Sequence, residues 1–139
     1  MLPTPLHAIA LRLCPGQDLR LELDALVQKK QWKAACVLTC VGSLTRATLR
    51  LAGQLNGTTY QGPFEIVSLT GVMGVAGSHY HMAIANSTGQ TLGGHVLPGC
   101  CIYTTAELVI GVLPALHFTR ELCSLSGYSE LKVCPHEKE

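Results

Sequence analysis

Three of the six histidines in this chain lie in two short segments rich in glycine, residues 77–81 (GSHYH) and 93–95 (GGH). Strand side chains alternate between two faces, so His79 and His81 point the same way, about 7 Å apart, if the first segment is a strand. Imidazole nitrogens are common zinc ligands, and three of them leave a fourth position open for water or a ligand. The spacing therefore indicates a metal site if His95 reaches the same face.

The turn between the two segments decides where His95 lies. Residues 86–90 (NSTGQ) are typical of a three-residue hairpin loop, in which Gly89 follows a type I turn in the left-handed region. In that register His81 lies directly opposite His95 and His79 lies on the diagonal, whereas a two-residue loop would send His95 to the other face. Gly93 and Gly94 would let a ligand or another backbone come close. The sequence therefore predicts one divalent-metal site formed by His79, His81 and His95.

The elements that must position these residues are mostly strands. One amphipathic helix is predicted after Asp18, which can cap it, with apolar residues at i, i+4, i+7 and i+8 from Leu19. Arg20 and Asp24 form an i,i+4 pair that we expect on the solvent side of this helix. The expected strands, separated by Gly and Pro, are residues 7–13, 35–41, 44–51, 64–72, 79–85, 91–97, 101–112 and 117–122. Residues 104–112 would also suit a helix. One helix among many strands with short connections predicts an α+β fold, a mostly antiparallel β-sheet packed with one or two helices.

Length and composition limit the class of protein. The 139 residues allow a single domain, which we expect to span residues 1–139 with a core over about residues 6–134 and flexible ends. Hydrophobic residues make up 47% of the chain and charged residues only 14%, whereas soluble domains usually carry about 25% charged residues. This composition suggests more apolar surface than one small domain can bury. Because obligate subunit interfaces are apolar, it favours a homo-oligomer.

The charge balance disfavours DNA binding by this chain alone. The chain has ten Lys and Arg residues and nine Asp and Glu residues, for a net charge of +1. Affinity for DNA, in contrast, comes largely from basic residues that neutralise its phosphates. The one basic cluster, Lys29, Lys30 and Lys33, is expected at the end of the helix. The sequence has no run of 18 apolar residues and no basic start of a secretory signal, so we expect a cytoplasmic protein that does not span a membrane. The seven cysteines have no regular spacing and are expected to be reduced thiols that fill the core.

Several short motifs occur in an order that resembles the PPC domain, whose name stands for plants and prokaryotes conserved. In chain order they are residues 41–44 (VGSL), 62–66 (GPFEI), 68–71 (SLTG), 77–81 (GSHYH), 93–95 (GGH), 105–107 (TAE), 118–121 (FTRE) and 127–131 (GYSEL). Each motif is weak alone, but in this order they are specific and cover nearly the whole chain. The resemblance implies a compact PPC-like α+β domain that assembles as a homotrimer.

The resemblance also implies a bound metal ion. In the single-domain prokaryotic type, the histidines of the GSHxH and GGH motifs resemble the ligands of a metal, often zinc, and they correspond to His79, His81 and His95. Plant members carry an Arg-Gly-Arg-Pro AT-hook for the DNA minor groove, which this chain lacks. Analogy with those nuclear proteins still leaves a nuclear location open. In plant members the segment corresponding to residues 62–67 is implicated in protein contacts. Here Pro63 replaces the usual Arg, and a strand entering the core is the simpler interpretation.

Three hypotheses for function follow. The first is a metal-binding, trimeric module that binds a small ligand at the metal's open position or has a regulatory role, without catalysis of its own. The second is a metal-dependent enzyme: the spacing from His79 and His81 to Gly93 fits a cupin motif, although Asn86 replaces the carboxylate ligand. The third, by family analogy, is a DNA-linked transcriptional regulator.

For other residues that could take part in chemistry, the sequence does not determine whether they lie near the histidines. An acid or base for the enzyme hypothesis could come from Glu65, Glu107 or Glu121. Three arginines could bind an anionic ligand, or could instead be interface or surface ion-pair residues: Arg46, Arg50 and Arg120. The remaining histidines have no suitable geometry and are assigned no site: His7, His117 and His136.

Overall fold

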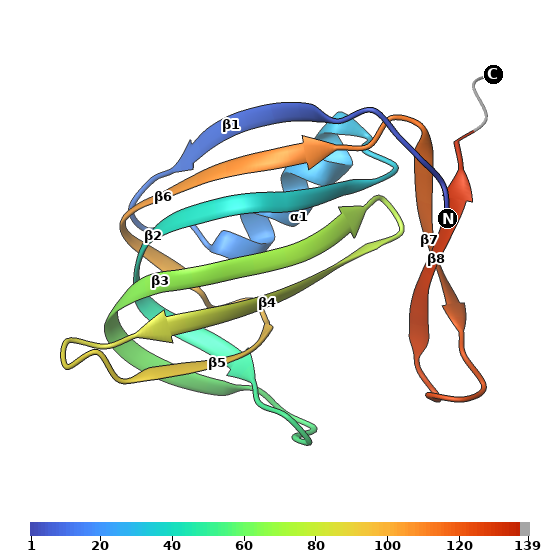
Figure 1. The fold of residues 1–139 in the computed structure, drawn as a ribbon. Coiled ribbons are helices and arrows are strands. Elements are labelled where there is room, and N and C mark those ends of the chain that lie inside the picture. The colour runs from blue at the N-terminus through green and yellow to red at the C-terminus, as the bar shows by residue number, and fades with distance from the viewer. Residues whose placement is uncertain (137–139) are drawn as a thin grey trace.

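The computed structural model describes residues 1–136. Within them, eight strands and one helix follow one another along the chain (Figure 1). Their bounds are β1 (His7–Leu13), α1 (Leu19–Lys30), β2 (Ala35–Arg50), β3 (Thr58–Gly74), β4 (Gly77–Ala85), β5 (Thr91–Val96), β6 (Cys101–Val112), β7 (Leu116–Leu122) and β8 (Ser129–Pro135). None of the described residues forms a helix long and apolar enough to cross a membrane.

Six of the strands form one antiparallel sheet in the order β1-β6-β2-β3-β4-β5. The sheet curls until β5 meets the end of β2 through Leu49 and Arg50, so that β2, β3, β4 and β5 close a ring. Helix α1 covers one face of the sheet, and β7 and β8 form a separate hairpin beside it (Figure 1). The α+β class, with a mostly antiparallel sheet and one helix, is therefore confirmed.

The helix begins and ends as its residues predict. The Asp18 carboxylate accepts a hydrogen bond from the Leu21 N–H at 3.1 Å, which satisfies one of the free donors at the helix start. The same carboxylate accepts from the Gly99 N–H at 2.6 Å and so ties the helix to the loop before β6. Lys29 and Lys30 occupy the last turn, as predicted. The buried stripe that packs on the sheet consists of Leu19, Leu23 and Val27.

The strands differ from the prediction in three places. The two strands predicted over residues 35–41 and 44–51 form one continuous strand, β2. Gly42 is therefore not a break between strands; it lets β6 come close, since a Cβ at this position would lie 2.2 Å from the Thr105 carbonyl oxygen. Strand β3 begins at Thr58, six residues before the predicted start at residue 64. Strand β6 has the predicted bounds, residues 101–112, and this excludes the alternative of a helix over residues 104–112. Strand β8 was missed, although residues 130–133 alternate polar and apolar side chains in the way that indicates a strand. It extends to Pro135, which we had placed in a flexible terminus; residues 137–139 of that terminus lie outside the described residues.

The cysteines only partly follow the expectation of a core role. All seven are free thiols. Cys40 and Cys100 are buried, and desolvation raises the pKa of each thiol to about 11. Cys14, in contrast, is exposed, so the prediction that the cysteines fill the core is wrong for this residue.

Candidate metal centre

The hairpin of β4 and β5 has the predicted register, and His81 is the direct partner of His95. The loop that sets this register closes through a hydrogen bond of 2.9 Å from the Asn86 N–H to the Gln90 carbonyl, and Gly89 adopts a positive φ of 81°. The Asn86 side-chain oxygen accepts hydrogen bonds from backbone N–H groups within the same turn. Asn86 is therefore a turn residue, and its side-chain oxygen bonds within the turn.

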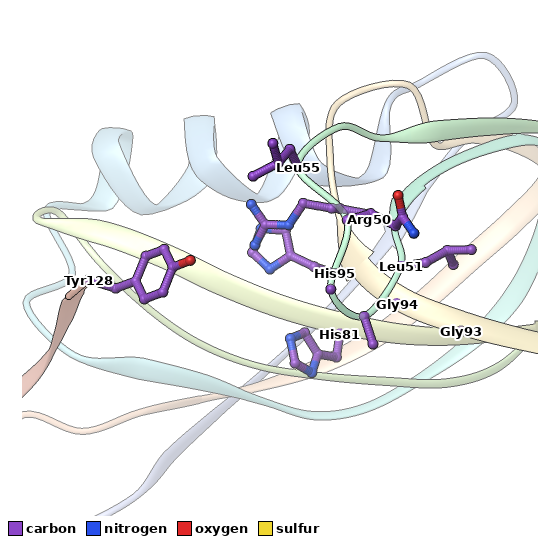
Figure 2. A pocket seen from close by; sticks show the side chains of 11 residues that line it. Arg50, Leu51, Leu55, His81, Gly93, Gly94, His95 and Tyr128 are labelled. Atoms are coloured by element: carbon purple, nitrogen blue, oxygen red, sulfur yellow. The ribbon is translucent and has the colours of Figure 1, made fainter. Parts of the chain in front are cut away.

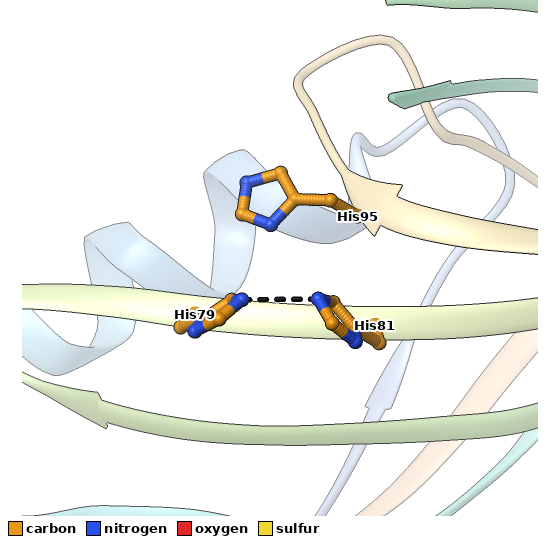
Figure 3. A group of neighbouring side chains, drawn as sticks. All are labelled: His79, His81 and His95. Carbon is orange, nitrogen blue, oxygen red and sulfur yellow. Dashed lines mark hydrogen bonds between the residues drawn. The ribbon is translucent and has the colours of Figure 1, made fainter. Parts of the chain in front are cut away.

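The three histidine rings converge on the face of the sheet that α1 does not cover (Figure 3). Ring centroids are 4.7 Å apart for His79 and His81, 5.0 Å for His79 and His95, and 5.8 Å for His81 and His95. The Nε2 atoms of His79 and His81 are 3.0 Å apart. One nitrogen from each ring lies within 4.8 Å of the other two. The predicted convergence of His79, His81 and His95 is thus present in the structure.

The free nitrogen of His95 shows how well this cluster suits a metal ion. Its Nε2 lies 3.4 Å from the Arg20 guanidinium, whereas its Nδ1 is buried and has no hydrogen-bond partner. A ring nitrogen of His95 faces the pair formed by His79 and His81 (Figure 3). In a tetrahedral zinc site with bonds of about 2.0–2.1 Å, ligand nitrogens are about 3.3 Å apart. The Nε2 atoms of His79 and His81, 3.0 Å apart, are close to this spacing, and the third nitrogen lies within 4.8 Å of them. With a small closing of the rings, the three nitrogens fit the coordination shell of a divalent ion.

The electrostatic surroundings of His79 and His95 favour the neutral form of these two rings, which is the form that binds metal. Burial lowers the pKa of His95 to about 4, and the charge of Arg50 is the next cause. Burial also lowers the pKa of His79, followed by the charges of His81 and Arg120. Protons therefore compete less for these nitrogens than they would in a solvated imidazole with a pKa of about 6.5.

Arg20 lies beneath the cluster, contrary to the prediction. It pairs with Asp24 at 3.4 Å, as the i,i+4 spacing indicates, but only 17% of its side chain is exposed. Its guanidinium donates to the Val96 carbonyl of β5 and, at 3.4 Å, to the Ser78 carbonyl of β4. These strands separate beyond the pair of His81 and His95, and Arg20 bridges them there. The helical pattern did not predict this burial of Arg20, because the residue lies next to the buried stripe and its long side chain reaches the sheet from there.

Gly93 and Gly94 serve the approach of other strands. A Cβ at Gly93 would lie 2.8 Å from the Met82 carbonyl oxygen of β4. A Cβ at Gly94 would lie 2.7 Å from the Arg50 carbonyl oxygen of β2. Of the two roles that the sequence left open, close approach of another backbone is the one the structure shows, and it allows β5 to pair with both neighbours.

A cleft in two lobes surrounds the histidines, and each lobe has a volume of about 540 Å³. The lobes share Arg50, His95 and Tyr128, and Figure 2 shows the Tyr128 hydroxyl directed toward the histidines. The second lobe is also lined by His79, Arg120, Ser129 and Glu130. Tyr128 and Glu130 belong to the motif at residues 127–131, but the sequence does not predict that they lie at the site, because both follow β7 on a hairpin whose return strand was missed.

The other candidate residues lie elsewhere. Glu121 forms an ion pair with Lys132, at 2.5 Å. Glu65 and Glu107 lie on β3 and β6, and neither borders the two lobes of the cleft. His117 and His136 have ring centroids 6.3 Å apart, and His7 lies on β1. Within residues 1–136, only His79, His81 and His95 form a group with metal-ligand spacing.

Comparisons with known proteins place this chain in a family. A hypothetical protein of Salmonella enterica has a solved structure that is 46% identical, with a TM-score of 0.95, and the match covers 97% of this chain and 98% of that one. The metal-containing protein AF0104 of Archaeoglobus fulgidus is 21% identical with a TM-score of 0.76, and the match covers 95% and 99% of the two chains. This second likeness, at low identity, concerns the fold.

A curated relative, the bifunctional protein GlmU of Synechococcus sp. (strain JA-2-3B'a(2-13)), is 44% identical over 135 residues. The match covers 97% of this chain but 21% of the relative, so the chain spans about a fifth of that protein's length. Residues 3–114 match the Plants and Prokaryotes Conserved (PCC) domain, also written PPC. With this match over most of its length, and with the motif order described above, the chain belongs to the PPC domain family.

Proposed function

We propose that this protein is a metal-binding PPC-domain module that holds a divalent ion, zinc, through His79, His81 and His95. The observation that carries the proposal is the convergence of three ring nitrogens within 4.8 Å, with Nδ1 of His95 buried and without a partner. Three neutral imidazoles suit zinc, and three protein ligands leave a position open for a further ligand. The description of a structural relative as metal-containing supports the same proposal.

The role we propose is the binding of a small ligand at the open position, as a sensor or regulatory module. The cleft beside the histidines supports it, since each lobe has about the volume of a small-molecule site. The enzyme hypothesis has one observation in its favour: Glu130 lines the cleft with His79 and could act as an acid or base. Hydrolytic or lyase activity that disappears in Glu130→Gln while the metal stays bound would favour the enzyme.

Elemental analysis and zinc titration of the purified protein test the metal site. We expect about one zinc ion per chain. The change His81→Ala should weaken zinc binding by more than the 10–100-fold that is typical of changes to outer-shell residues. His7→Ala, on the exposed part of β1, is the matched control and should leave binding unchanged. Undiminished zinc binding by the His81→Ala protein would place the metal elsewhere.

We further propose that the chain assembles as a homotrimer. On the sheet face opposite α1, apolar side chains are left exposed, with Val41 at 58%, Val67 at 57% and Leu38 at 46%. Burying such a face against further copies would remove apolar surface from water, which stabilises an assembly. The low charged fraction of the chain and the family resemblance support the same proposal.

A further inference from the structure

We propose that the ligand of this centre is a small oxyanion, a carboxylate or a phosphate, which binds between the metal ion and the guanidinium groups of Arg50 and Arg120. This inference rests on the proposed metal function, because it names the class of ligand for the open position of the same ion. It is carried by the placement of the two arginines, by the charge balance of the cleft and by the size of the cleft.

Arg50 is placed beside the histidines by the pairing of β2 with β5. It is the last residue of β2 and the direct partner of His95. Cross-strand partners project to the same face with Cβ atoms about 4.5–5.5 Å apart. Because His95 also pairs with His81, a continuous row runs across three strands from His81 through His95 to Arg50. The Arg50 side chain is exposed and borders both lobes of the cleft, the first of which is drawn in Figure 2.

Arg120 approaches from a different part of the fold. It belongs to β7, in the hairpin outside the main sheet, and lines the second lobe together with His79. The stem of its side chain lies over Gly77, where a Cβ would be 3.9 Å from the Arg120 Cγ. Arg50, from β2, lines the same lobe, so both arginines border it together with His79 and His95. The two guanidinium groups therefore approach the histidine cluster from two sides.

The charge of the cleft is not balanced by the protein. Neither Arg50 nor Arg120 forms an ion pair with a carboxylate within residues 1–136. Arg20 is paired with Asp24. Glu130 is the one acidic residue among those that line the two lobes. Three neutral imidazoles would not offset the charge of a divalent ion, so the loaded centre carries excess positive charge that an anion would neutralise.

The donors and the volume of the cleft suit an oxyanion of modest size. A guanidinium presents a planar fork of N–H donors that matches carboxylate and phosphate oxygens. The Tyr128 hydroxyl, directed toward the histidines, adds a neutral donor (Figure 2). Each lobe has a volume of about 540 Å³, within the range of about 300–1,000 Å³ that is usual for small-molecule sites.

A cobalt-substituted protein provides the test, because the visible spectrum of Co²⁺ reports changes in its coordination. Cobalt is first titrated into the protein to establish that it binds at the histidines. Inorganic phosphate and succinate are then titrated separately, at fixed ionic strength, with chloride as the reference anion. We expect a saturable spectral change with at least one of the two oxyanions and not with chloride. The relative affinities of phosphate and succinate distinguish a phosphorylated ligand from a carboxylic acid.

Three arginine variants identify the groups involved. We expect Arg50→Gln and Arg120→Gln each to weaken oxyanion binding by at least about tenfold, since hydrogen bonds to charged groups are among the stronger ones. Both variants should bind cobalt with the stoichiometry of the unmodified protein. Arg46→Gln is the matched control, because Arg46 lies on the same strand, is exposed and does not border either lobe.

The possible outcomes separate this inference from the proposed function. If cobalt binds but neither oxyanion changes the spectrum, the oxyanion inference is wrong and the metal function stands. If cobalt does not bind at the histidines, the metal function itself is wrong, and the inference fails with it. If Arg46→Gln weakened oxyanion binding as much as Arg50→Gln did, the inference would also be overturned, because the effect would then reflect the overall charge of the protein.

Discussion

The Arg20 guanidinium, on helix α1, lies 3.4 Å from Nε2 of His95, on strand β5. A guanidinium has only donors, so it suits an Nε2 that accepts, and in a neutral imidazole the proton then lies on Nδ1, the nitrogen that faces the other two histidines. When Nδ1 binds a metal ion, the proton lies on Nε2 instead and this contact joins two donors; Arg20 therefore opposes metal binding, unlike the usual outer-shell acceptor of a ligating histidine. Arg20 thereby links the helix, the strand ends and the candidate metal centre.

We expect Arg20→Met to destabilise the fold and to strengthen metal binding. The carbonyl groups of Ser78 and Val96 would lose a donor, at a cost of about 1–3 kcal/mol in the free energy of unfolding if they stay buried. The zinc affinity should rise, because a fixed guanidinium no longer lies near the cation and Nε2 of His95 can carry the ring proton without facing another donor. Urea unfolding and zinc titration measure the two effects. A fall in zinc affinity would mean that Arg20 acts mainly by holding His95 in position and not through its charge.

The stability of the metal-free protein should fall as the pH drops below about 6.5, the ordinary histidine pKa. The folded-state pKa of His95 is lowered to about 4 by burial and by Arg50. Between these two values the unfolded chain binds a proton that the folded protein does not, so the free energy of unfolding decreases with decreasing pH. The contribution of His95 is fully present above about pH 6.5 and is lost as the pH approaches about 4.

The measurement is urea unfolding of the chelator-treated protein across this pH range. His95→Gln removes the titrating group, so its stability should depend less on pH than that of the unmodified protein. The same pH dependence in both proteins would show that His95 is not the group responsible.

The histidine cluster could be predicted from the sequence because its geometry is local. Strand alternation fixes the relation of His79 and His81, and one turn with Gly89 in the left-handed region fixes the relation of His81 and His95. No contact distant in the sequence is needed for either step. The helix start at Asp18 was predictable for the same reason, since a cap acts within one turn.

The surroundings of the cluster depend on contacts between distant segments, which periodicity does not reveal. Arg50 reaches His95 only because the sheet curls far enough for β2 to pair with β5. Arg120 and Tyr128 reach the cleft on a hairpin that lies outside the main sheet. Arg20 was placed on the solvent side because a helical pattern gives the direction of a Cβ and not the reach of a long side chain.

Gly94→Ala should weaken the metal site without touching a ligand. The new Cβ would lie 2.7 Å from the Arg50 carbonyl oxygen, so β5 must move away from β2. Overpacking of this kind typically costs about 1–3 kcal/mol, and the shift would also move the neighbouring His95. We expect a lower free energy of unfolding and weaker zinc binding. Thr91→Ala, at the exposed start of the same strand, is the control and should change neither by much. Unchanged zinc affinity in Gly94→Ala would show that the histidines tolerate the strand movement.

The proposed homotrimer should dissociate when charge is placed on the sheet face that α1 leaves uncovered. Val41 is 58% exposed on this face, so Val41→Glu should be tolerated in the single chain but should place a carboxylate in an apolar interface. Burying an unpaired charge is costly, and dissociation avoids that cost. Light scattering at micromolar concentration should give the mass of three chains for the unmodified protein and of one chain for the variant. Leu21→Glu, on the exposed side of α1, is the matched control and should remain a trimer. A mass of one chain for the unmodified protein would rule out the assembly, and a trimeric Val41→Glu protein would place the interface on another surface.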